Sequence, residues 1–448
     1  MIYTSSSNPR MYNAPWNTWL PRAGIAYRVN DKTSVRAGYS RYAVPWVTIH
    51  PETGGLPTYG FSQSTPVLGP LQGTPRAYLS NPFPSTNPVV LPSGNTGGGN
   101  TDVGNSISFW NGNAMKTPLN DRLNFSVQHQ TMEHLFAEAT FFIHYGHNVQ
   151  DGSMWGGSNG YNLNAVNPAL SYQFKGLLDQ TVTNPFYGLP SSVMPGSLAT
   201  QPTVAVSQLL RQYPQYGDLT QLGWPGGRDH YYGLALKVER PMAKGLGFMF
   251  GYNYNQENHT QYLNPLDQYT NTYTMLDREQ PRHNFTAAGT WEIPVGRGRT
   301  FLGNTNKIVD GVIGGWATSQ IFMAHGGDLL NFNQATVTGN PQQNVPAGYY
   351  FNPAVFAVSP SYTPRTNPWY YPGLRGPSFW QLDSTAVKYF PITEKIKLEI
   401  RFELFNMPNI YMPGDPDTTI GSGTMGRSTS PASGNYGREV QYSAKIHF

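Results

Sequence analysis

Cysteine is absent from this chain of 448 residues. Without thiols the chain has neither a disulfide framework nor thiolate ligands for a metal. Charge is scarce as well, because Asp, Glu, Lys and Arg make up only 12% of the residues, about half of the ~25% that is usual in soluble domains. The net charge is +4, and the basic residues form no run or arm. A nucleic-acid partner is therefore not expected.

Long apolar runs are missing too. No window approaches the ~18 apolar residues of a membrane helix, and the mean hydropathy is −0.44. The first residues, MIYTSSSNPRMYNAPWNTWLPRAG, lack the charged start and apolar segment of a secretory signal peptide. The 48 Gly and 38 Pro interrupt most windows before two helical turns could form. Hydropathy alone would indicate a soluble protein, but it does not detect membrane β-barrels, in which half of each strand is polar.

What the sequence does contain is alternation of apolar and polar residues with the period of a β-strand. From Ile396 to Leu404, every second residue is apolar, and the residues between them are Lys397, Glu399, Arg401 and Glu403. The last ten residues, EVQYSAKIHF, follow the same pattern, with an apolar set made of Val440, Tyr442, Ala444, Ile446 and Phe448. Because successive side chains of a strand point to opposite faces, each predicted strand has one apolar and one polar face.

These segments come in pairs, and connections alternate between short and long. Eleven strands of about 10–12 residues are predicted. NDK, MEH, PMAKG and TEK form short turns, and the stretch PVGRGRTFLGNTNKIVDGVIG links one further pair. The long connections cover about residues 44–118, 147–228, 257–282, 326–377 and 407–436. Tight periplasmic turns and long extracellular loops are typical of outer-membrane barrels, and a tilted strand of ~11 residues spans their apolar band of ~25 Å.

Soluble all-β folds agree less well with these spacings. A β-propeller repeats every ~40–50 residues, whereas the hairpins here start near residues 19, 119, 229, 283 and 378. A soluble sandwich would have to carry two loops of more than 70 residues. The predicted fold class is therefore all-β, a portion of an antiparallel transmembrane β-barrel.

The polar faces of such strands would line the lumen of the barrel. On the strand that begins at Ile396, the candidate lumen-facing residues are Lys397, Glu399, Arg401 and Glu403. Two roles stay open for these charges. They either solvate and cross-brace the wall, or they contact a plug domain or a passing substrate.

No pattern of catalytic residues is present. Neither GxSxG nor HExxH occurs, and the carboxylates are scattered. The stretch GSGTMG at residues 421–426 matches GxGxxG, but no strand leads into it and no helix is predicted after it. A dinucleotide site needs that helix N-terminus for the pyrophosphate, so the match is rejected. We therefore do not expect an enzyme, a catalytic residue or a cofactor.

Metal-binding patterns are equally incomplete. His144 and His147 have a spacing that ligands can use, but no third ligand lies nearby in the sequence. Asp415 and Asp417, in GDPDTT, resemble part of a calcium loop, although the glycine and glutamate that should follow are absent. Calcium bound in this loop by the two aspartates and backbone carbonyls is kept only as an alternative to having no metal.

An ordered series of segments runs along the chain. It includes WLPRAGIAYRVNDKTSVRAGYSRY, LNFSVQHQ with FAEATFFIHYGHN, YPQYGDLTQ with YYGLALKVERPMAKGLGFMFGYNYNQ, QPRHNFTAAGTWEIPVGRGRTFL, and FPITEKIKLEIRFELFNMPN. The series resembles the Oar-like group of TonB-dependent outer-membrane receptors, which carry a carboxypeptidase-regulatory-like domain. Each piece is weak alone, but the order covers most of the chain. The resemblance implies a 22-stranded barrel, closed by an N-terminal plug and driven through the TonB complex.

The resemblance also implies roles for the C-terminus and for the missing parts. Tyr442, Ala444, Ile446 and Phe448 resemble the terminal signal that barrel-insertion machinery recognises. Nothing in the sequence resembles a plug, a TonB box, a regulatory-like domain or a signal peptide. Because eleven strands are half of 22 and an open half-barrel would leave strand edges unpaired in lipid, residues 1–448 are expected to be the C-terminal part of a longer receptor.

These observations predict a chain in the bacterial outer membrane, in contact with its lipid. The predicted function is TonB-dependent transport of a bulky substrate, such as an oligosaccharide or a peptide, with TonB engaged through the plug of the parent protein. A passive porin and a cell-surface glycan-binding or adhesin protein are the alternatives. The sequence does not identify the substrate.

Overall fold

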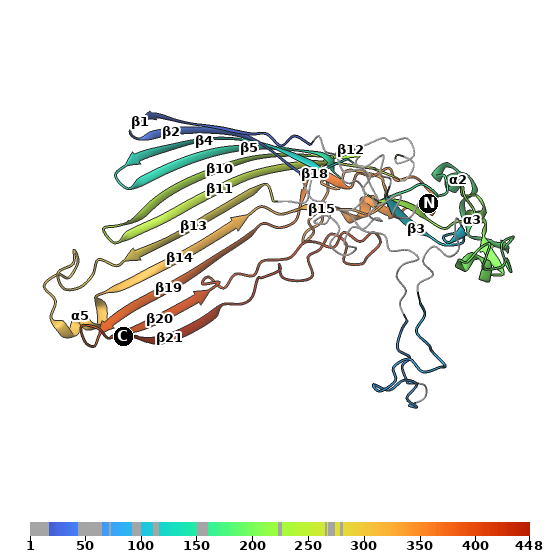
Figure 1. The fold of residues 1–448 in the computed structure, drawn as a ribbon. Helices are drawn as coiled ribbons and strands as arrows, with labels where there is room; N and C mark the ends of the chain where they lie inside the picture. The colour runs from blue at the N-terminus through green and yellow to red at the C-terminus, as the bar shows by residue number, and fades with distance from the viewer. Residues whose placement is uncertain are drawn as a thin grey trace.

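The computed structural model describes residues 18–43, 65–70, 73–91, 100–110, 116–149, 160–222, 226–264, 267, 274–277 and 281–448. Its main feature is one curved antiparallel sheet (Figure 1). In spatial order, which is also chain order, its strands are β1 (Arg22–Asn30), β2 (Thr33–Ala43), β4 (Leu119–Met132), β5 (Leu135–Val149), β10 (Gly227–Ala243), β11 (Leu246–Gln261), β13 (His283–Glu292), β14 (Trp316–His325), β19 (Phe379–Pro391), β20 (Lys397–Phe405) and β21 (Glu439–His447). The short β12 (Thr274–Asp277) pairs with β11 beside this path. The eleven predicted strands thus correspond to the eleven strands of the path.

Local turn chemistry explains why neighbours in sequence pair in the sheet. At the β10–β11 hairpin, Ala243 pairs with Leu246. The two residues between them, Lys244 and Gly245, have φ angles of 53° and 76°. Two successive positive φ angles are the signature of a type I′ turn, whose twist matches that of paired strands. This tight turn fixes the register of two long strands.

The register separates the side chains into two faces, named here the apolar face and the polar face. Directly paired residues lie on the same face of a sheet. One row of the apolar face consists of Ile25, Ala37, Phe125, Phe141, Leu234 and Tyr254, and another of Val238, Phe250, Ala287, Phe322 and Leu382. The polar face includes Arg36, Ser126, Thr140, Thr286, Ser319 and Thr385. Many large side chains of the apolar face are exposed, so the described residues leave much of this face uncovered.

The connections differ between the two ends of the sheet, as the sequence predicts. At one end β1–β2, β4–β5, β10–β11 and β19–β20 are joined by short turns, and the β13–β14 connection contains α5 (Lys307–Ile313). The C-terminus lies at this same end (Figure 1). The described parts of the long connections lie at the other end, which we call the loop end (Figure 1).

The long connections have more regular structure than their composition predicts. Their described residues contain β3 (Ile107–Trp110), β6 (Gly160–Asn162), α2 (Pro168–Phe174), β7 (Thr181–Thr183), β8 (Thr203–Ala205), α3 (Val206–Leu209), β9 (Leu219–Leu222), β15 (Leu329–Asn331), β16 (Ala335–Val337), β17 (Phe356–Val358), β18 (Tyr370–Arg375) and the short 3₁₀ helices Lys175–Asp179, Ser197–Thr200 and Pro353–Val355. No helix among the described residues has the length and apolar character needed to cross a membrane.

Buried apolar packing is concentrated in these loops rather than in the sheet. The cluster that we call the loop core consists of Leu330, Phe332, Ala335, Phe351, Phe356, Leu374 and Met425. Phe332 stacks on Phe356, with ring centroids 5.0 Å apart, and meets the edge of Phe351 at 5.1 Å. Because Met425 comes from the β20–β21 connection and the other members from the β14–β19 connection, this core holds two loops together.

Candidate functional site

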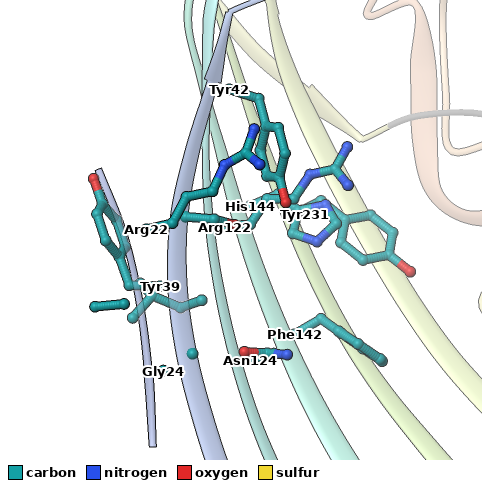
Figure 2. A pocket seen from close by; sticks show the side chains of 13 residues that line it. Arg22, Gly24, Tyr39, Tyr42, Arg122, Asn124, Phe142, His144 and Tyr231 are labelled. Carbon is teal, nitrogen blue, oxygen red and sulfur yellow. The ribbon is translucent and has the colours of Figure 1, made fainter. Parts of the chain in front are cut away.

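A hollow of about 690 Å³ opens beside β1, β2, β4, β5 and β10, toward the loop end of the sheet (Figure 2). Two arginines and three rings with polar atoms lie in its polar-face lining. These residues, named here the arginine–tyrosine cluster, are Arg22, Tyr42, Arg122, His144 and Tyr231. They come from five strands, so the pairing of the sheet alone brings them together.

The register explains how residues so far apart in sequence meet. Arg22 pairs with Ser40, which pairs with Arg122. Arg122 pairs in turn with His144, which pairs with Tyr231. The row therefore crosses five strands on the polar face, and Tyr42 lies on that face because it is two residues beyond Ser40.

The contacts within the cluster are cation–π and stacking contacts. The guanidinium carbons of Arg22 and Arg122 lie 4.7 Å and 5.0 Å from the centre of the Tyr42 ring. His144 and Tyr231 stack with centroids 5.0 Å apart, as Figure 2 shows. Among the described residues, neither arginine has a carboxylate as an ion-pair partner. The cluster therefore has two positive charges beside aromatic rings, and Glu257, which pairs with Tyr231, continues the row on β11.

This arrangement suits a ligand that carries an acidic group next to a ring. A guanidinium offers a planar fork of donors to a carboxylate or phosphate. Tyrosine and histidine rings offer flat faces for stacking. Sequence analysis missed the cluster because its members are separated by up to about two hundred residues and join only through strand pairing. The available signal was an arginine at a polar-face position in each of two predicted strands, 20–29 and 119–131.

A second polar network lies on the opposite side of the same strands. Asp121 accepts hydrogen bonds from Arg41 Nε at 2.6 Å and from Tyr39 Oη at 2.7 Å. Its other oxygen lies 2.9 Å from Arg41 Nη2 and 2.9 Å from His147 Nε2. Tyr39 points away from the rings of the cluster in Figure 2. This network, the Asp121 network, ties together β2, β4 and β5 on the apolar face at its loop end.

The four candidate lumen-facing residues share one face of β20. The Glu399 carboxylate is buried and accepts from Arg401 Nε at 2.9 Å, and its other oxygen lies 2.9 Å from His447 Nε2. Arg401 also lies 3.5 Å from Glu403. Lys397 pairs with Pro391 and His447 at the short-turn end. These side chains lie on the polar face, and three of them are linked by ion pairs along the strand.

The C-terminal residues lie on the apolar face of the last strand. Tyr442 pairs with Phe402, Ala444 with Ile400, and Ile446 with Leu398. The side chain of Phe448 is 95% exposed. A role for this row as an insertion signal stays a prediction.

The two histidines of the motif HYGHN do not converge. His144 stacks on Tyr231 on the polar face, whereas His147 contacts Asp121 on the apolar face. An odd spacing on a strand places two side chains on opposite faces. In the described part of the chain, no group of three His, Asp or Glu residues is arranged to hold a metal ion.

Residues 421–426 form turns, and Asp417 organises them. Its carboxylate accepts from the backbone N–H of Thr419 at 2.8 Å and from Thr424 Oγ1 at 2.7 Å. Hydrogen bonds from the hydroxyls of Ser422 and Thr424 and from the backbone of Thr419 lower the pKa of Asp417 well below its ordinary value. Asp415 lies beside Gly376 instead. The two aspartates therefore have separate environments here, and calcium in this loop stays a prediction.

Solved structures of large outer-membrane receptors resemble this chain. The ferripyoverdine receptor of Pseudomonas aeruginosa is 11% identical, with a TM-score of 0.38, and the match covers 96% of this chain and 32% of that one. The ferric-catecholate import receptor Fiu from E. coli K12 is 10% identical, with a TM-score of 0.39, and the match covers 95% of this chain and 34% of that one. The siderophore receptor PirA from Acinetobacter baumannii is 11% identical, with a TM-score of 0.41, and the match covers 96% of this chain and 41% of that one. The chain spans less than half of the length of each of these structures.

Comparison with curated proteins found no match. Comparison with family models gave a match over almost the whole chain. The model described as an outer membrane β-barrel domain covers residues 1–441. The match agrees with a sheet that has one exposed apolar face and one polar face, short turns at one end and long loops at the other. The chain therefore belongs to the family of outer membrane β-barrel domains and is a protein of the bacterial outer membrane.

Proposed function

We propose that this chain is a portion of the barrel wall of a TonB-dependent outer-membrane transporter, and that the arginine–tyrosine cluster contacts the substrate inside the barrel. In an outer-membrane barrel the apolar face meets lipid and the polar face lines the lumen. The row that runs from Arg22 through Arg122 and His144 to Tyr231 lies on the polar face. Two exposed arginines in one row with half-buried rings are the observation that carries the proposal.

The chemistry of the cluster favours a particular kind of bulky substrate. Two guanidiniums without a carboxylate partner among the described residues suit an acidic group. The faces of Tyr42, His144 and Tyr231 suit a sugar or an aromatic ring. We therefore propose an oligosaccharide or peptide that carries carboxylate or phosphate groups. Coupling to TonB rests on the family resemblance and belongs to the plug of the longer receptor.

Uptake of labelled acidic oligosaccharides and peptides by the bacterium that makes the protein tests this function. The paired variant Arg22→Gln and Arg122→Gln is compared with Arg36→Gln, which removes an exposed arginine from the same face outside the hollow. We expect uptake to fall at least several-fold in the paired variant, to stay near the wild-type level in the control, and to stop without TonB.

Three outcomes would contradict the proposal. Uptake that continues without TonB would indicate a passive porin. Glycan binding at the cell surface without uptake would indicate an adhesin. Equal uptake by the paired variant and the control would remove the cluster from the substrate path.

A further inference from the structure

The connection between β13 and β14 is a folded unit rather than a plain turn. We name residues 293–315 the α5 hairpin. Val295 bridges Phe301, and the N–H of Gly296 donates to the Phe301 carbonyl at 2.9 Å. The Asn306 side chain then caps α5 by accepting from the N–H of Val309 at 2.9 Å. The hairpin therefore presents its side chains in a defined arrangement.

Two contacts hold the end of α5 over the apolar face of the sheet. Lys388 pairs with Ile400 and Trp316, so it occupies a position on the apolar face. Its ammonium group nevertheless is covered: Nζ donates to the Gly314 carbonyl at 2.6 Å, and the residue is only 3% exposed. Trp316 Nε1 donates to the Val312 carbonyl at 2.9 Å. The last turn of α5 thus lies on the lipid side of the wall, at the short-turn end.

The hairpin leaves large apolar side chains uncovered. Ile308 is 83% exposed and Val312 is 68% exposed. They are four residues apart, so they lie on one side of α5. Phe301 and Leu302 are exposed as well. Transfer of such side chains out of water is favourable, and the neighbouring apolar face offers lipid as the apolar surroundings.

Basic residues accompany this apolar surface. Arg297, Arg299 and Lys307 are all exposed. The Asp310 carboxylate accepts from the N–H of Arg297 at 2.6 Å and packs against Gly314, so it is turned into the hairpin. Glu292 lies 3.7 Å from Arg299 at the end of β13. The exposed charge of the hairpin is therefore mostly positive.

We infer that the α5 hairpin binds the phospholipid surface of the periplasmic leaflet, with Ile308 and Val312 in the acyl boundary and its basic residues at anionic headgroups. Apolar residues on one side of a short helix, basic residues beside them and a fixed position at the rim of a membrane wall are the features of an interfacial anchor. This inference goes beyond transport and does not depend on the substrate.

The absence of cysteine makes a direct test straightforward. Single variants Ile308→Cys and Val312→Cys carry a spin label in outer membranes isolated from the producing cell. Phe250→Cys on the apolar face is the lipid control, and Glu133→Cys, in the exposed β4–β5 turn, is the water control. We expect the ratio of oxygen to nickel-chelate accessibility at 308 and 312 to be several-fold above that at 133 and to approach that at 250.

Labels at 308 and 312 that behave like the label at 133 would overturn the inference and leave a surface for a periplasmic protein. The headgroup contact has its own test in the protein purified from outer membranes. Vesicles of phosphatidylethanolamine mixed with phosphatidylglycerol are compared with phosphatidylethanolamine alone. We expect the 308 label to be deeper with the anionic lipid, and the triple variant Arg297→Gln, Arg299→Gln and Lys307→Gln to lose that difference. An equal depth in both lipids would refute the anionic contact.

Discussion

Arg41 donates two parallel hydrogen bonds to Asp121, from Nε to Oδ1 at 2.6 Å and from Nη2 to Oδ2 at 2.9 Å. The pair joins β2 to β4, and His147 extends it to β5. It lies on the apolar face, where an uncompensated charge would be costly in lipid. The position at the loop end and the paired geometry reduce that cost, because charges near the interface are cheaper than charges at the midplane.

Asp121→Asn should therefore weaken the wall at this edge. The substitution removes one charge of a bidentate pair and leaves Arg41 without its partner. We expect the free energy of unfolding to fall by about 1–3 kcal/mol. Thermal unfolding of the detergent-solubilised protein measures this loss. Arg41→Gln alone and with Asp121→Asn completes a double-mutant cycle, and fully additive losses would show that the pair has no coupling.

Arg365 should be the main polar support of the loop core. The residue is buried, and its guanidinium donates to the carbonyls of Phe332, Asn367 and Pro368 while it lies 3.5 Å from the Trp369 ring centre. Burial lowers the pKa of Arg365 to about 10. Arg365→Lys keeps the charge but cannot reproduce the planar fork, which leaves buried carbonyls without donors. We expect a loss of about 1–3 kcal/mol in loop stability.

Hydrogen exchange of the Phe332 amide, which donates to the Trp369 carbonyl at 2.9 Å, reports this loss. Arg427→Lys is the matched control, because Arg427 is exposed and only lies over the Tyr349 ring. The control should leave the exchange rate of Phe332 unchanged. Equal acceleration by both variants would contradict a specific role for Arg365.

The strands of the main sheet were predictable from the sequence because their signal is local. Alternation within β20 and the Lys244–Gly245 turn act over a few residues, so strands, faces and turns follow from short windows. Lys388 shows the limit of that reasoning. It interrupts the apolar row of β19, and its partner carbonyl in Gly314 is more than seventy residues away. Only the folded hairpin explains a lysine at this position.

The arginine–tyrosine cluster and the loop core were not predictable for a related reason. Four strand registers align Arg22 and Tyr231 in one row, and a one-residue slip in any of them would turn one side chain to the other face. Phe332 and Phe351 lie in segments rich in Gly, Pro and Asn without strand or helix periodicity. Their burial results from packing between two loops. A short stretch of sequence does not show which residues of another loop will pack against it.

Lys388→Met should loosen the end of α5 without disturbing β19. Methionine suits the apolar face, but it cannot donate to the Gly314 carbonyl. We expect faster hydrogen exchange of the Gly314 amide, which donates to Asp310 at 2.9 Å, and little change in thermal stability. Lys397→Met, on the polar face of the neighbouring strand, is the control. Unchanged exchange at Gly314 in Lys388→Met would show that the contact does not hold the hairpin.

The turn at residues 417–427 should lose stability in acid. The hydroxyls of Ser422 and Thr424 and the Thr419 amide lower the pKa of Asp417 in the folded turn. A lowered folded pKa gives a stabilisation that is present above the ordinary value of 3.8 and is lost as the pH falls below it. Amide protection of Thr419, corrected for intrinsic exchange, should thus be constant near neutral pH and decline below about pH 4.

Asp417→Asn should remove that pH dependence and lower the protection of Thr419 at neutral pH, because the neutral amide is a weaker acceptor for three donors. If Asp417→Asn left the acid decline at Thr419 intact, a different group would have to carry it.

Asp328→Asn should act in the opposite direction. Burial, with the nearby Asp415, raises the pKa of Asp328, so its ionisation costs stability as the pH rises, and one of its oxygens is buried without a donor. The amide variant removes that charge, and the amide of Gly376, which donates to the Asp328 carbonyl at 2.9 Å, should exchange no faster than in the wild type.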